Sequence, residues 1–143
     1  MFNIYVISIK PEFANKILKG EKKVEFRKVI PKEAVGSFFF VYSSSPEKKV
    51  VCVFKCTKVI SDTDKEKVWK KTKKDAGITK EFFDEYFKEK DYATALVFDS
   101  ITQTCLGGME RLDYYGIKTP PQNYAIAFKN IEELKQSIIR QLN

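Results

Sequence analysis

Three ionisable side chains follow residue 20 at close spacing: Lys22, Glu25 and Arg27. Alternation between residues 22 and 29 predicts a strand that carries Glu25 and Arg27 on one face. There they can form a lateral ion pair that holds the planar guanidinium of Arg27 in position for a phosphate or a base edge. Gly20 frees the backbone to leave a helix, which places Lys22 at a helix–strand corner from which it can reach the mouth of a cleft. The alternative is a surface salt bridge worth roughly 0–1 kcal/mol.

Hydroxyl and amide side chains extend this candidate binding site. Ser43, Ser44 and Ser45 lie where a predicted strand meets a turn, so their hydroxyl and backbone N–H groups can hydrogen-bond a ligand. Serines also stabilise turns, and both interpretations stay open. Gln122 follows two prolines that stiffen its loop, and its amide can contact a base edge.

Positive charge is concentrated near the start of the chain. The formal net charge is +7, and the stretch Lys10 to Lys32 holds eight Lys and Arg residues against three Glu residues, a local balance of +5. Such a concentration suits contacts with nucleic-acid phosphates, for which Lys10 is a further candidate. A solvated lysine-rich surface without a ligand is the alternative.

The residue types that are missing restrict the chemistry. The 143 residues include no histidine, which excludes Ser-His-Asp and Cys-His nucleophilic systems and His-ligated zinc. The three cysteines are an odd number, and Cys52 and Cys56 share one face of a strand that is apolar on both sides. They are expected to be reduced core residues. We therefore predict no metal and no cofactor.

The hydrophobic pattern predicts short strands around a few helices. Aromatic residues 82, 83, 86 and 87 on one predicted helix are expected to pack on the sheet. The strands are predicted at residues 2–9, 22–29, 37–44, 50–60, 92–98, 104–112 and 124–128, and the helices at residues 11–19, 61–76, 79–87 and 130–142. These elements are neither consecutive by type nor strictly alternating, which predicts an α+β fold, a small mixed β-barrel flanked by helices.

One domain accounts for the whole chain. Residues 1–143 match the size of a single compact domain, and 43% hydrophobic residues supply a core. No apolar run approaches the roughly 18 residues that a membrane span needs, and the start has no secretory pattern. A cytoplasmic protein without membrane contact is expected.

The corner from Gly20 to Arg27 matches the pattern G-x-K-x-x-E-x-R, through Gly20, Lys22, Glu25 and Arg27. The chain thereby resembles the ASCH family of PUA-like domains. A first strand that ends in Ser-Ile-Lys-Pro and the later Tyr-Ser-Ser-Ser-Pro also look like this family, so the resemblance spans most of the chain. It implies a PUA-like β-barrel, and proposed roles of the family lie in RNA processing or transcription coregulation.

Some members of the family are enzymes, which gives a second hypothesis. Relatives that remove the acetyl group from a modified cytidine use the motif lysine, and this implies a catalytic role for Lys22. Those relatives carry threonine where Glu25 stands, so this chain departs from their pattern. Other relatives cleave RNA, and in this chain Tyr42, Ser43 or Ser44 would have to supply a hydroxyl beside Lys22.

Three functions follow from these observations. The first is a protein that binds RNA or a nucleotide-derived ligand, with phosphates on the Lys10–Lys32 face. The second is a metal-independent hydrolase that acts on N4-acetylcytidine or RNA through Lys22. The third is an adaptor that binds a protein partner through the lysine-rich helix between residues 62 and 76.

Overall fold

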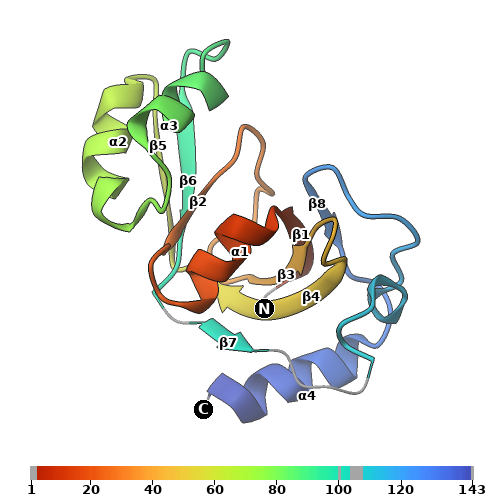
Figure 1. Ribbon diagram of the computed structural model, residues 1–143. Coiled ribbons are helices and arrows are strands. Elements are labelled where there is room, and N and C mark those ends of the chain that lie inside the picture. Colours follow the sequence, from red (N-terminus) through yellow and green to blue (C-terminus); the bar gives the residue numbers. More distant parts are fainter. Residues whose placement is uncertain (1–2, 100, 104–107, 143) are drawn as a thin grey trace.

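The computed structural model describes residues 3–99, 101–103 and 108–142, whose strands lie in two sheets (Figure 1). The larger sheet has the order β7-β4-β3-β1-β8, and the smaller has the order β2-β6-β5. The elements in chain order are β1 (Ile4–Ile9), α1 (Pro11–Leu18), β2 (Val24–Phe26), β3 (Phe38–Ser43), β4 (Lys49–Lys55), β5 (Lys58–Asp62), α2 (Lys65–Thr72), α3 (Lys80–Tyr86), β6 (Ala93–Val97), β7 (Ile101–Gln103), β8 (Tyr124–Ile126) and α4 (Ile131–Leu142), with short 3₁₀ helices at Lys73–Asp75 and Leu112–Tyr115.

Strand β1 is buried on both faces because its alternate residues enter two different cores. Ile4 and Val6 pack with Leu134 of α4 on one side of the large sheet. Ile7 packs with Ile17 of α1 on the other side. The apolar character of both faces, visible in the sequence, thus fits a strand covered by a helix on each side.

The connection from β1 to β3 carries the residues of the corner into position. The two strands are parallel neighbours, with Ile4 opposite Phe38, so the chain must cross over between them. This crossover contains α1 and β2. Strand β2 pairs with β6 of the small sheet, with Glu25 opposite Leu96, so the corner lies where the two sheets meet.

Helices α2 and α3 cover the small sheet. Val68 of α2, Phe83 of α3 and Phe87, which follows α3, pack against Val24 and Phe26 of β2 in a third hydrophobic core. The side chains that flank Glu25 along the strand are therefore fixed by packing. None of the helices in residues 3–99, 101–103 and 108–142 combines the length and apolar character that a membrane span requires.

The α+β class is confirmed, and several details of the predicted architecture are wrong. In the described part of the chain the strands form two sheets rather than a closed barrel. The strand predicted at 50–60 is two strands, because after Cys56 the chain leaves β3 and Thr57 N–H donates to the carbonyl of Val97 in β6. The strand predicted at 22–29 spans only Val24–Phe26.

Two further boundaries differ from the expected ones. Ser61 belongs to β5, and Asp64 caps α2 by accepting a hydrogen bond from the backbone N–H of Glu66 at 3.1 Å. Of the strand predicted at 104–112, residues 104–107 lie outside the described residues, and Leu112 begins a 3₁₀ helix.

Candidate functional site

A cleft of about 430 Å³ opens where the two sheets meet. Its walls come from the end of β1, from α1, β2 and α3, from the turn after β3 and from the loop before β8. The lining residues are Ser8, Ile9, Lys10, Phe13, Lys22, Glu25, Phe26, Arg27, Ser44, Ile78, Phe82, Tyr86, Pro120, Pro121 and Gln122. Six of the eight predicted site positions therefore border one cavity, which falls in the size range of small-molecule sites.

Lys22 is one of the largest buried side chains of the protein, with 2% of its surface exposed. Its ammonium donates a hydrogen bond to the carbonyl of Ala76 at 2.7 Å and lies 5.6 and 5.5 Å from the ring centres of Phe13 and Phe26. The aliphatic stem passes directly over Gly77. Burial lowers the pKa of Lys22 below its ordinary value of 10.5, and the nearby Glu25 carboxylate opposes this shift.

Glu25 lies between two cations. One carboxylate oxygen, Oε1, is 3.5 Å from Lys22 Nζ, and the other, Oε2, accepts hydrogen bonds from Arg27 Nε and Nη2 at 3.0 and 2.8 Å. The predicted ion pair of Glu25 and Arg27 is present, and both side chains are about nine-tenths buried. The small stabilisation expected of an exposed surface salt bridge therefore does not describe this buried pair.

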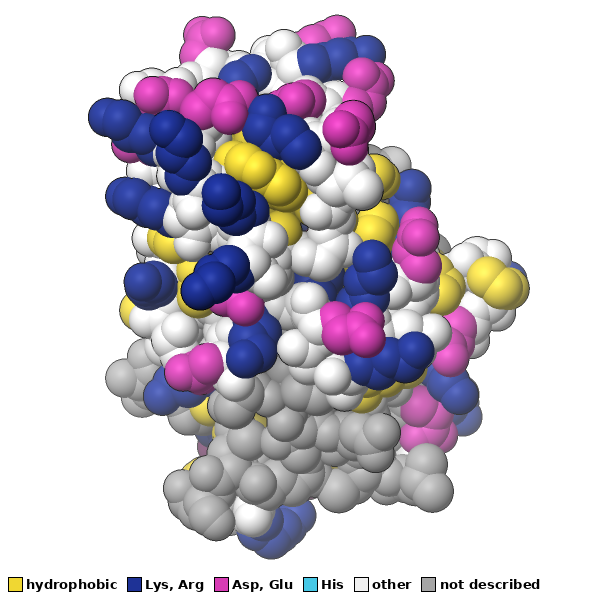
Figure 2. Space-filling model, turned by 60° about the vertical axis from the view of Figure 1, so that its left-hand side comes forward, with side chains coloured by type: hydrophobic (Ala, Val, Ile, Leu, Met, Phe, Trp, Pro, Cys, Tyr) yellow, Lys and Arg dark blue, Asp and Glu magenta, His cyan; other side chains and the backbone are white. Residues whose placement is uncertain are grey.

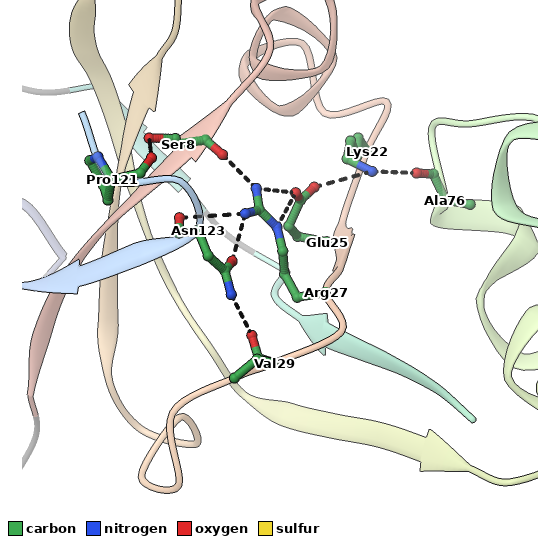
Figure 3. A network of polar contacts seen from close by, with 8 residues as sticks. All are labelled: Ser8, Lys22, Glu25, Arg27, Val29, Ala76, Pro121 and Asn123. Carbon is green, nitrogen blue, oxygen red and sulfur yellow. Dashed lines mark hydrogen bonds and ion pairs between the residues drawn. The ribbon is translucent and has the colours of Figure 1, made fainter. Parts of the chain in front are cut away.

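Arg27 connects Glu25 to two other segments of the chain (Figure 3). Its guanidinium donates to the backbone carbonyl of Ser8 at the end of β1 and to Asn123 Oδ1 at 2.7 Å. Asn123 in turn donates from Nδ2 to the carbonyl of Val29 at 2.9 Å. The guanidinium of Arg27, which was predicted to meet a phosphate or a base edge, thus points at acceptors within the protein. It holds the carboxylate and the loop before β8 in place.

The remaining predicted positions separate into three groups. Lys10, Ser44 and Gln122 line the cleft, with Lys10 and Gln122 exposed. Ser45 is exposed on a neighbouring groove. Ser43 is fully buried, lies on neither cavity, and its hydroxyl has no hydrogen-bond partner among the described residues.

Some lining residues were not predicted as site residues. The aromatic face of α3 was expected only to pack, and Phe83 and Phe87 do so, whereas Phe82 and Tyr86 line the cleft. Phe82 is 41% exposed. Burial raises the pKa of the Tyr86 hydroxyl. The aromatic residues of this helix form a stripe that is broader than the face that packs on the sheet, and this breadth could have indicated that some of them line a cleft. No local pattern assigned a role to Asn123, the partner of Arg27.

Figure 2 shows one face of the molecule, with Lys and Arg side chains gathered along its left margin and hydrophobic side chains exposed beside them. Within the described residues no group of three or more Cys, Asp or Glu side chains is arranged to hold a metal ion. The side chains that line the cleft include a lysine with a lowered pKa, a carboxylate, hydroxyls and aromatic rings.

Comparisons with known proteins agree with the motif and the fold. An ASCH domain-containing ribonuclease of Zymomonas mobilis is 34% identical over 92 residues, which cover 64% of this chain and 62% of that relative. The crystal structure of an ASCH protein of the same organism covers 96% of this chain and 94% of its own, with 26% identity and a TM-score of 0.79.

Crystal structures of two variants of that protein, one with tyrosine replaced by phenylalanine and one with serine replaced by alanine, give the same TM-score at 25% identity. The sequence model of the ASCH domain matches residues 7–102, a stretch that contains Lys22, Glu25 and Arg27. The chain therefore belongs to the ASCH domain family.

Proposed function

We propose that this ASCH protein binds single-stranded RNA by holding one nucleotide in the cleft. The observation that carries the proposal is a buried ammonium on a cleft floor whose walls are aromatic and prolyl side chains. Sites that hold unstacked bases combine aromatic surfaces with cations. The net charge of +7 and the ribonuclease name of a relative support RNA as the partner. We infer a cytoplasmic location, which an RNA partner supports.

Each part of a nucleotide has a matching group in this cleft. Phe82 and Tyr86 offer rings on which a base can stack. The amide of Gln122 suits a base edge, because it both donates and accepts hydrogen bonds. Lys10 is exposed at the rim, where a phosphate can meet it with little desolvation. Arg27 contributes by holding Glu25 and the loop that carries Gln122.

RNA cleavage is a second candidate, and the environment of Lys22 favours it. A lysine whose pKa is lowered by burial has a larger neutral fraction, and the neutral amine can accept a proton. Accepting the proton of a ribose 2′-hydroxyl would let that oxygen attack the adjacent phosphorus, as the 5′-oxygen of the next nucleotide leaves and takes up a proton. Of the hydroxyls considered beside Lys22, only that of Ser44 belongs to a residue that lines the cleft.

The test compares wild type with Lys22→Met, which keeps the aliphatic stem over Gly77 and removes the charge. A matched control is Lys70→Met on the exposed face of α2, with the same change in net charge. Fluorescence anisotropy with single-stranded RNA across salt concentrations measures binding, and mass spectrometry with RNA or N4-acetylcytidine detects products.

We expect salt-dependent binding that Lys22→Met weakens and Lys70→Met preserves. Products that require Lys22 would establish an enzyme. Equal effects of the two variants would refute the cleft as the site. RNA binding that only Lys70→Met weakens would assign the RNA contact to α2 and refute the cleft.

A further inference from the structure

A second groove lies beside the cleft and shares a wall with it. It encloses about 620 Å³, and Ser44 and Pro120 line both cavities. The backbone N–H of Ser44 donates to the carbonyl of Ile9 in β1 at 2.9 Å, which fixes this side of the wall to the large sheet. An RNA strand that leaves the cleft over Ser44 and Pro120 would enter the second groove directly.

The rim of the second groove is positively charged. It carries Lys48, Arg111 and Lys118 against one carboxylate, that of Asp113. Arg111 is already paired with Asp113 at 2.8 Å. Lys48 and Lys118 are exposed, and within the described residues neither has a carboxylate within 4.0 Å. Two unpaired ammonium groups are therefore available to an anion.

The floor of the groove is apolar. Tyr42 and Ile117 are 4% and 8% exposed, and they form this floor together with Leu112. An apolar floor under a cationic rim suits the two chemical parts of a nucleotide, a base or sugar face and a phosphate. It also differs from the cleft, where the buried Lys22 and Glu25 lie on the floor itself.

We propose that this groove is a subsite for the nucleotide next to the one held in the cleft, with Lys48 and Lys118 contacting phosphates. The inference rests on the proposed function and specifies its substrate class: a single strand of at least two nucleotides, rather than a free nucleoside or mononucleotide. The phosphate that joins the two nucleotides crosses the shared wall, where the Ser44 side chain lies.

The experiment removes the charge of the second groove and leaves the cleft intact. The double variant Lys48→Ala/Lys118→Ala is compared with Lys67→Ala/Lys70→Ala, which removes two exposed lysines from α2 and touches neither cavity. Affinities are measured for nucleoside monophosphates by calorimetry and for labelled hexaribonucleotides by anisotropy, with mass spectrometry to verify that the RNA stays intact.

We expect the groove variant to bind hexanucleotides roughly 10-fold more weakly at low salt. The slope of log affinity against log salt should fall by about 1.4, because each phosphate contact to a single strand contributes about 0.7. Mononucleotide affinity should stay unchanged, and the α2 variant should behave as wild type.

Other outcomes separate the two proposals. If wild type binds hexanucleotides and the groove variant binds them equally well, the subsite is refuted and the RNA function stands. The subsite is also refuted if the α2 variant loses as much affinity as the groove variant, because bulk charge then explains the effect. If wild type binds neither RNA nor mononucleotide, the proposed function fails, and the subsite fails with it.

Discussion

Substituting alanine for Gly77 tests whether the backbone beside Lys22 sets the geometry of the cleft floor. Gly77 has φ +67°, in the left-handed region, where a Cβ costs about 1–2 kcal/mol. A Cβ at this position would lie 2.7 Å from Lys22 Cβ and 2.8 Å from Lys22 Cγ. Lys22 is buried and tied to Ala76, so its stem has little freedom to move, and overpacking adds about 1–3 kcal/mol. The expected loss in unfolding free energy is about 2–5 kcal/mol.

The chain supplies matched controls for this substitution. Gly20 and Gly36 have φ +77° and +85°, and a Cβ on either meets no atom within 4 Å. Gly20→Ala and Gly36→Ala should therefore cost only the backbone term of about 1–2 kcal/mol. Urea unfolding at 25 °C measures all three variants, and RNA binding at a temperature where each is folded measures the cleft. If Gly77→Ala loses no more stability than Gly36→Ala and binds RNA normally, the contact with Lys22 does not shape the site.

Three further predictions concern the buried polar groups and the core. Arg27→Lys should lower the unfolding free energy by about 1–3 kcal/mol and weaken RNA binding, because a single ammonium cannot replace the fork that holds Glu25; an unchanged urea midpoint would contradict this. Since the pKa of Lys22 is lowered on folding, the unfolded chain binds more protons between that pKa and 10.5, so wild-type stability should rise with pH relative to Lys22→Met in this window. A stability difference that is flat with pH would refute it. Burial raises the pKa of Cys52 to about 12 and also raises that of Cys56, so a thiol reagent at pH 8 should modify these two positions only after unfolding, as peptide mass spectrometry can show.

Local sequence patterns predicted the parts of the site that depend on neighbouring residues. Strand alternation placed Glu25 and Arg27 on one face, and they are paired there. The glycine after the first helix marked the corner correctly, since Gly20 adopts the left-handed conformation that ends α1. These features need only the periods of helix and strand, which a single sequence displays.

The environment of the charged groups could not be predicted, because it depends on contacts between distant segments. The hydrogen bond from Lys22 to Ala76 joins residues 54 positions apart, and that from Arg27 to Asn123 spans 96 positions. The helix and strand periodicities of a sequence do not predict such distant pairs. The break between β4 and β5 was missed for a similar reason: residues on both sides of Cys56 favour strands, and only the different partners, β3 and β6, separate them.

The charge balance of the cleft floor links the two candidate functions. With Lys22 protonated, the three groups Lys22, Glu25 and Arg27 sum to +1; with Lys22 neutral they sum to zero. A phosphate placed beside Lys22 would stabilise its ammonium form and raise its pKa, so binding would take up protons. A neutral base in the same place would exclude water and keep the pKa lowered, which maintains the free amine that proton abstraction requires. The position of the phosphate relative to Lys22 therefore decides between a binding lysine and a catalytic one, and the number of protons taken up on binding distinguishes them.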